Sequence, residues 1–108
     1  MTSLKASETI DHVVRGSALL TNAVGLHARP SVKLTQLAKS FGARILVSTQ
    51  VSGPWIDAKS PVKIMRVKAP KGTTLYFEAT GADARLAIKA LLDLVNRNFD
   101  ESEADSHG

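Results

Sequence analysis

The 108-residue sequence lacks cysteine, has few aromatic residues and contains no long apolar run. Without cysteine there are no disulfides and no thiolate ligands for zinc or iron–sulfur clusters, so stability must come from packing and a reducing cytoplasm is the expected location. Aromatic residues make up only 5% of the chain, which disfavours a protein that stacks single-stranded bases. No apolar run approaches the roughly 20 residues that a membrane-spanning helix needs, so we expect no membrane insertion.

Charge is modest in total and uneven along the chain. Lys and Arg number 14 against 10 Asp and Glu, a net charge of +4, and acidic residues gather after Phe99, which leaves the body more basic. A basic body suits an acidic protein or a nucleic acid, and charge alone does not choose between them. The short length allows one domain with one core and disfavours a multistep enzyme that would need a second lobe.

The chain is predicted to consist of an extension, one domain and a tail. Residues 1–12 have no hydrophobic period and lack the apolar stretch of a secretory signal, so they are expected to be a flexible extension. Residues 13–99 carry regular patterns and no linker that would divide them, which indicates a single domain. Residues 100–108 are acidic and are expected to be a disordered tail.

Hydrophobic periodicity predicts four strands and three helices within 13–99. The expected strands span 13–21, 43–50, 55–58 and 73–80, and the expected helices span 30–41, 60–68 and 83–98. The order β-α-β-β-α-β-α, with short connections and one apolar face per element, predicts an α+β fold. The expected architecture is an open-faced two-layer sandwich, in which three helices cover one face of an antiparallel four-stranded sheet.

A histidine and an arginine stand just before the first predicted helix, in the segment GLHARPS at 25–31. Pro30 suits a first helical turn, because the amide that proline lacks would have no partner there. His27 is therefore expected at or just before the helix N-terminus, where free amides and the helix dipole attract an anion. Arg29 adds a fixed charge that can hold phosphate or carboxylate oxygens in a fork. The pattern is typical of an imidazole that accepts a phosphoryl group.

The residues alone leave the role of His27 open. A histidine in this place can also be a simple helix cap, with Arg29 as a solvated side chain, and the spacing does not exclude that. A metal site is disfavoured because His12 and His107 fall in the predicted extension and tail, and no ligand-type residue has a suitable spacing to His27. We expect neither a metal nor a cofactor, and no serine, histidine and acid set indicates a catalytic triad.

The hexapeptide GLHARP at 25–30 resembles the active-site signature of the histidine-containing phosphocarrier (HPr) family of the bacterial phosphoenolpyruvate-dependent phosphotransferase system. The resemblance covers about residues 15–99, including the strings AKS at 58–60, KGT at 71–73 and EATG at 78–81. It implies that His27 accepts a phosphoryl group on Nδ1 from phosphorylated enzyme I. A downstream acceptor, an EIIA-type domain or a kinase subunit of a sugar-transport or regulatory pathway, would then receive the group.

The resemblance implies roles for further residues. Arg29 would support the phosphoryl group and Pro30 would fix the helix start, so that the protein is a carrier and a substrate of other transferases, not an enzyme. A docking face would be formed by the first helix and the segment around the second. Its expected contacts are Leu26, Lys33, Lys59, Lys63 and Arg66, of which the basic residues can equally be solvated charge.

Ser60 matches a position that a serine kinase phosphorylates in some family members, which makes it a candidate regulatory site. A serine before a proline is also a good helix N-cap, and we favour that interpretation. Pro61 departs from the family, in which a large apolar residue follows the serine. The longer turn at 51–55 and the N-terminal extension are further departures, and together they indicate a paralogue that serves a nitrogen-related or regulatory relay, or a phosphotransferase-linked kinase.

An alternative function is a regulatory module of the same fold that acts by docking to a kinase or regulator, with Ser60 as a phosphosite. The intact GLHARP segment favours the carrier, because docking alone does not need the histidine. A third hypothesis, a small nucleic-acid-binding domain, rests only on the basic charge. We therefore expect no nucleic-acid partner.

Overall fold

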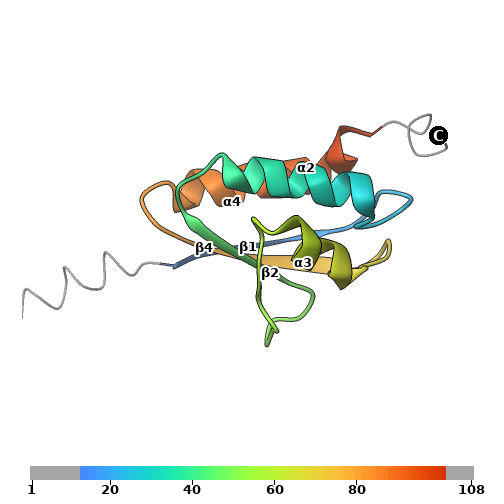
Figure 1. Cartoon of the computed structure of the whole chain (residues 1–108), viewed down its shortest axis with the longest axis horizontal. Helices are drawn as coiled ribbons and strands as arrows, with labels where there is room; N and C mark the ends of the chain where they lie inside the picture. Colours follow the sequence, from blue (N-terminus) through green and yellow to red (C-terminus); the bar gives the residue numbers. More distant parts are fainter. Residues whose placement is uncertain (1–12, 102–108) are drawn as a thin grey trace, which may run out of the picture.

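The computed structural model describes residues 13–101 (Figure 1). The extension predicted for 1–12, and residues 102–108 of the tail predicted for 100–108, lie outside the described residues. Within them the elements follow the predicted order: β1 (Val13–Leu19), α2 (Ala28–Lys39), β2 (Arg44–Ser48), β3 (Ile56–Asp57), α3 (Pro61–Val67), β4 (Thr74–Thr80), α4 (Ala84–Asn96) and a short 3-10 turn, η1 (Asn98–Asp100).

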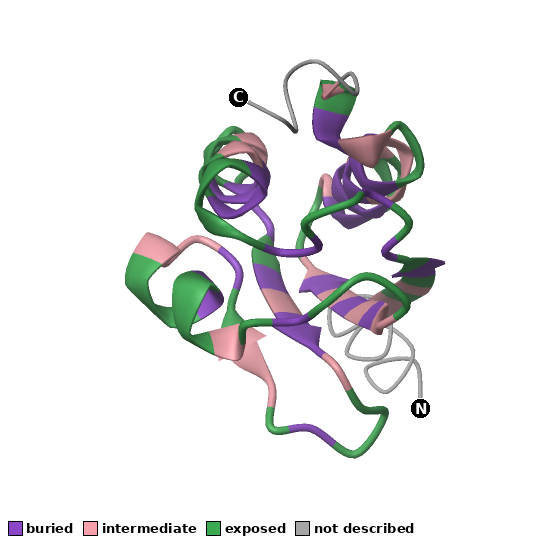
Figure 2. Ribbon diagram, turned by 90° about the vertical axis from the view of Figure 1, so that its right-hand side faces the viewer, coloured by how far each residue is buried: buried purple, intermediate pink, exposed green. Residues whose placement is uncertain are grey.

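The four strands form one antiparallel sheet in the order β1-β4-β2-β3. Strand β4 is central and pairs along its whole length with β1, from Val13 opposite Thr80 to Leu19 opposite Thr74. Helices α2 and α4 lie side by side over one face, while α3 packs against α2 and β3 (Figure 2). The predicted open-faced α+β sandwich is confirmed.

The core fills the space between the sheet and the helices. Burial alternates along strand β4, with Leu75, Phe77 and Ala79 buried and the residues between them half-buried. Leu34 and Ala38 on α2 are fully buried, whereas Leu37 on the same helix and Phe41 just after it lie at the margin of the core. One small residue sets how closely the layers approach: a Cβ atom at Gly16 would lie 2.8 Å from Leu92 Cδ1 on α4.

The predicted element ends differ from the structure by a few residues. Strand β1 stops at Leu19, two residues earlier than predicted, and the strand expected at 55–58 is reduced to Ile56–Asp57. Two residues assigned to the predicted tail lie in the described structure: Asp100 closes η1, and Glu101 follows it. Phe99 is fully buried, which holds this turn against the body of the protein.

Asp83 connects the start of α4 to the loop between α2 and β2. It occupies the N-cap position of α4, but its side chain makes no cap hydrogen bond. Its two carboxylate oxygens instead accept hydrogen bonds from the amides of Gly42, at 2.9 Å, and Ala43, at 2.8 Å. Hydrogen bonds to a charged group are stronger than neutral ones, so this carboxylate fixes the path of the chain into β2.

We predict that Asp83→Ala lowers the free energy of unfolding by about 1.5–3 kcal/mol, because two amides lose a charged acceptor. Urea denaturation measures this change. The matched control is Asp93→Ala, which removes an exposed carboxylate that pairs with Lys89 one turn away at 3.0 Å. Such pairs contribute about 0.2–0.5 kcal/mol, so equal losses in the two variants would contradict the role given to Asp83.

Candidate functional site

His27 occupies the N-cap position of α2, as the sequence predicts. Its backbone is extended, with φ −90° and ψ −168°, and its carbonyl oxygen accepts a hydrogen bond from the Ser31 amide at 2.9 Å. The side chain makes no cap hydrogen bond and is exposed. The helix is therefore closed by the backbone of His27 alone, and the imidazole ring is left available to other groups.

The first turn of α2 has the charge distribution of an anion site. The amides of Ala28 and Arg29 precede the first intrahelical hydrogen bond, and Pro30, buried in the same turn, has no amide hydrogen. No acidic residue lies in this turn. The positive end of the helix dipole is therefore not neutralised by its own helix, and it faces the side of His27.

The loop before His27 is held by a few short-range contacts. The Asn22 side chain donates to the Gly25 carbonyl at 2.7 Å, while the Asn22 carbonyl accepts from the Gly25 amide at 3.2 Å. The next amide, of Leu26, donates to the carbonyl of Ala69 at 2.8 Å. Gly25 has φ +65°, and a Cβ there would lie 2.5 Å from the Ala69 oxygen. The glycine of the GLHARP motif is thus required by the contact with the segment after α3.

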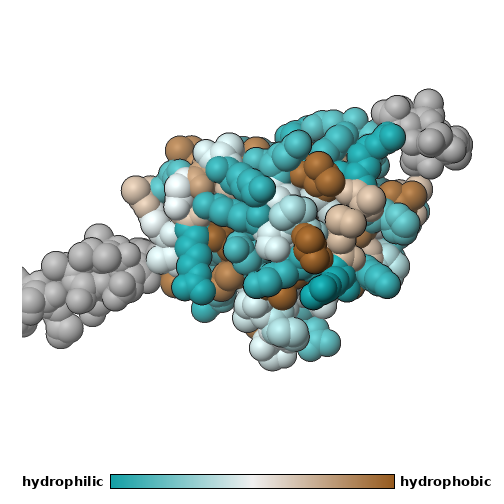
Figure 3. Space-filling model, in the orientation of Figure 1, coloured by the Kyte–Doolittle hydropathy of each residue, from teal (hydrophilic) through white to brown (hydrophobic). Residues whose placement is uncertain are grey.

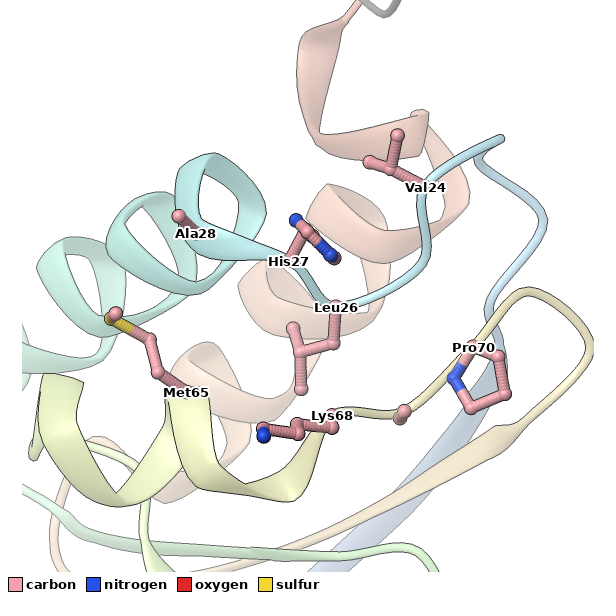
Figure 4. Close-up of a pocket in the computed structure, with 8 residues that line it drawn as sticks. Val24, Leu26, His27, Ala28, Met65, Lys68 and Pro70 are labelled. Carbon is pink, nitrogen blue, oxygen red and sulfur yellow. The ribbon is translucent and has the colours of Figure 1, made fainter.

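His27 borders an open pocket of about 570 Å³ between the start of α2 and the end of α3 (Figure 4). Its other walls come from the loop before α2, from α3 and from the chain that follows α3. They are formed by Val24, Leu26, Ala28, Met65, Lys68, Ala69 and Pro70. Lys68 ends α3 in the left-handed conformation, with φ 50°, and brings a second cation to the site. Lys68 was not predicted as a site residue from the sequence. The one sequence feature that could have indicated it is its position at the end of the predicted helix, shortly before Pro70.

Arg29 is exposed over 58% of its side chain and has a carboxylate partner. Its Nε atom lies 3.9 Å from Oε2 of Glu101, whose side chain is only 5% exposed. The sequence predicts Arg29 beside His27, and both residues do lie at the start of α2. Glu101 was missed because an acidic residue in an acidic run is usually solvated.

The expected docking residues have different environments. Lys63 and Arg66 are exposed on α3, as expected of a docking face. Two others are engaged within the molecule: Lys33 Nζ donates to the Phe99 carbonyl, and Lys59 Nζ donates to the Phe41 carbonyl, both at 2.7 Å.

Leu26, expected among the docking contacts, is buried in the structure. It is only 2% exposed, because the hydrogen bond of its amide to Ala69 draws it into the core beneath the pocket. Exposed apolar side chains do occur on α2 and α3, where Figure 3 shows apolar atoms among hydrophilic ones. They are Val32, Val62 and Met65.

Ser60 is the N-cap of α3, as predicted. Its side-chain oxygen accepts from the Lys63 amide at a long 3.4 Å, and Pro61 is the first helical residue. The structural role is therefore present, and phosphorylation of Ser60 stays a prediction.

Between residues 13 and 101, no three histidine, cysteine or acidic side chains gather as metal ligands would. None of the helices in this range has the length and apolar character needed to cross a bilayer.

Comparison with known proteins gives consistent matches over this region. Residues 14–97 match the family model described as the PTS HPr component phosphorylation site. The phosphocarrier protein HPr of Cupriavidus necator is 42% identical over 84 residues, which cover 78% of this chain and 92% of the relative. The phosphocarrier protein NPr of Escherichia coli is 34% identical over 88 residues, which cover 82% and 97%. A crystal structure of HPr from Thermoanaerobacter tengcongensis superposes with a TM-score of 0.75 at 34% identity, covering 82% of this chain and 98% of that one.

We predict that Gly25→Ala destabilises the protein more than Gly72→Ala does. Both glycines have positive φ, +65° and +96°, so alanine is strained at either, by about 1–2 kcal/mol. Only at Gly25 does the new Cβ meet backbone atoms, whereas at Gly72 nothing lies within 4 Å. The clash adds about 1–3 kcal/mol. Urea denaturation measures both variants, and equal losses would show that the loop before His27 is not held against Ala69.

Proposed function

The chain belongs to the HPr family of phosphocarrier proteins of the phosphotransferase system, and we propose that it carries one phosphoryl group on His27. The group comes from the phosphohistidine of enzyme I and passes to a downstream acceptor, an EIIA-type domain or a kinase subunit, in the cytoplasm. The observation that supports this most directly is the exposed His27 ring, which leaves the capping of α2 to the backbone.

The chemistry is a transfer between two imidazoles. A lone pair on the His27 ring forms a nitrogen–phosphorus bond while the nitrogen–phosphorus bond on enzyme I breaks. One proton leaves the other ring nitrogen of His27, and the released imidazole of enzyme I takes one up, so no further reactant is needed. The same steps in the opposite sense pass the group to the acceptor. The protein is therefore a substrate of two transferases and has no turnover of its own.

The start of α2 supplies the electrostatic part of this transfer. The transferred group carries negative charge on its three outer oxygens, and stabilising that charge is the main task in phosphoryl transfer. The free amides of Ala28 and Arg29, together with the Arg29 guanidinium, offer donors without a metal. Lys68 adds a further positive charge across the pocket.

Partner binding is proposed for the exposed surface of α2 and α3 beside His27. Val32, Val62 and Met65 are exposed apolar side chains on these two helices, and Lys63 and Arg66 stand among them. An apolar centre with a basic rim is typical of a transient interface with an acidic partner. The surface thus lets a partner dock with its own active site over the ring.

We expect the wild-type chain to gain the mass of one phosphoryl group when incubated with phosphoenolpyruvate and catalytic enzyme I. His27→Ala should gain none, because the acceptor nitrogen is gone. Intact-protein mass spectrometry measures the change, and the bound phosphate should be lost in acid and kept in base. His12→Ala and His107→Ala are the matched controls and should be labelled like wild type. Labelling that survives in His27→Ala, or an acid-stable phosphate, would refute the proposal.

We further predict that Met65→Asp raises the KM of enzyme I for this protein about 5- to 30-fold, since loss of one central apolar contact weakens a complex by about 1–2 kcal/mol. Steady-state phosphorylation assays give this value. Leu86→Asp is the control, because Leu86 is even more exposed, at 65% against 44%, but lies on α4 outside the proposed surface. Equal effects of the two variants would place docking elsewhere.

A further inference from the structure

Helix α3 ends in a backbone conformation that is unfavourable for its residue. The C-cap, Lys68, has φ 50° and ψ 45°, in the left-handed region where helices commonly end with glycine. A side chain in this region crowds its own backbone, so glycine would be the more favourable residue on local grounds. Strain of this kind persists where the surrounding structure enforces it, and it is concentrated at functional sites.

Contacts of the following residue fix the backbone of Lys68 beside the site. Ala69 is buried, and its carbonyl oxygen accepts a hydrogen bond from the amide of Leu26 at 2.8 Å. Gly25 approaches the same oxygen so closely that a Cβ atom there would lie 2.5 Å from it. Because Leu26 directly precedes His27, Lys68 and His27 are each one residue away from this hydrogen bond. Their backbones are therefore held in a fixed relation to one another.

The side chains of Lys68 and His27 line one open pocket of about 570 Å³ from opposite walls (Figure 4). The remaining wall residues are apolar: Val24, Leu26, Ala28, Met65, Ala69 and Pro70. Among the residues that line the pocket, Lys68 is thus the one with a permanent charge. An anion on the His27 ring would face this ammonium across partly apolar surroundings, where opposite charges attract more strongly than in bulk water.

The Lys68 ammonium is not engaged within the described part of the chain. The ion pairs between residues 13 and 101 use other cations, namely Arg15, Arg29, Lys89 and Arg97. The ammonium groups of Lys33 and Lys59 donate to backbone carbonyls, whereas no side-chain hydrogen bond is formed by Lys68 in this range. Its side chain is exposed, so it can turn toward an anion without breaking an existing contact.

We propose that the Lys68 ammonium binds an outer oxygen of the phosphoryl group carried by His27, as a second cation besides Arg29. This inference rests on the proposed function and assigns Lys68 a contact that exists only in the phosphorylated protein. A charge-assisted hydrogen bond made only after transfer shifts the equilibrium toward phosphorylated His27. The strained end of α3 is then explained by function, because glycine at this position would offer no ammonium.

The first test measures the phosphorylation equilibrium of full-length variants. Each protein is equilibrated with catalytic enzyme I at fixed ratios of phosphoenolpyruvate to pyruvate, and mass spectrometry gives the phosphorylated fraction. We expect Lys68→Gln to lower the equilibrium constant about two- to fivefold, the size of effect typical of one exposed ion pair. Lys68→Arg keeps a cation and should stay near wild type. Lys71→Gln is the matched control and should leave the constant unchanged, because Lys71 is exposed on the same segment but does not line the pocket.

A glycine variant separates the role of the ammonium from any role in folding. Glycine adopts the left-handed conformation without strain, so Lys68→Gly should unfold at the same urea concentration as wild type or at a higher one. Its phosphorylation equilibrium should nevertheless fall as far as that of Lys68→Gln, because both variants lose the ammonium. A loss that occurs in Lys68→Gly but not in Lys68→Gln would come from the backbone, and it overturns the inference.

The ammonium could instead pair with a carboxylate of the docked partner. In that case Lys68→Gln raises the KM of enzyme I and leaves the phosphorylation equilibrium at its wild-type value, which overturns the inference. In the isolated protein, the NMR signal of the Lys68 side-chain nitrogen should move when His27 is phosphorylated, while that of Lys71 should not. An unmoved Lys68 signal also overturns the inference, and each of these results leaves the carrier function intact. A wild-type chain that enzyme I does not phosphorylate overturns the carrier function, and the inference with it.

Discussion

The site depends on one contact between two distant segments, the loop before α2 and the chain after α3. The amide of Leu26 donates to the Ala69 carbonyl, and Gly25 leaves no room for a side chain against the same oxygen. The sheet leads directly to this contact, because Leu20 exchanges hydrogen bonds with Thr73 and Gly72 just beyond the last pair of β1 and β4. The position of His27 is thus determined by the pairing of β1 with β4, although the residue itself lies on the surface.

An exposed histidine suits the proposed carrier, because the phosphoryl group must be received from one protein and passed to another. A closed site would protect a phosphohistidine from water but would also block a second protein from reaching it. Here the pocket is open, and the surface beside it combines exposed apolar side chains with cations. In the proposed carrier, exclusion of water comes from whichever partner is docked, and the chain alone supplies a ring, free amides and Arg29.

The sequence predicts what local patterns determine and misses what distant contacts determine. The order of elements, the placement of Pro30 in the first turn of α2 and the position of His27 follow from periodicity and from the amide hydrogen that proline lacks, although α2 begins at Ala28, two residues before the predicted start. The burial of Leu26 does not, because it depends on a carbonyl more than forty residues away. Lys33 and Lys59 were expected to be docking contacts or solvated charges, but each donates to a backbone carbonyl, of Phe99 and Phe41 respectively. These hydrogen bonds could not be predicted, because no sequence pattern marks a particular carbonyl as an acceptor. Glu101 was missed for the same kind of reason, since only the fold of the turn at 98–100 brings it to Arg29.

Gly16 allows α4 to pack closely against β1. Its missing side chain lets Ile88 and Leu92 pack directly on β1, so the middle of α4 lies close against the sheet. The far end of α4 continues into the turn that carries Glu101. Helix α4 therefore contacts β1 closely at Gly16, and Glu101, the carboxylate partner of Arg29, follows its C-terminal end. A larger side chain at position 16, on the edge strand and away from the histidine, would push α4 away from β1. That displacement would alter the separation of Glu101 and Arg29.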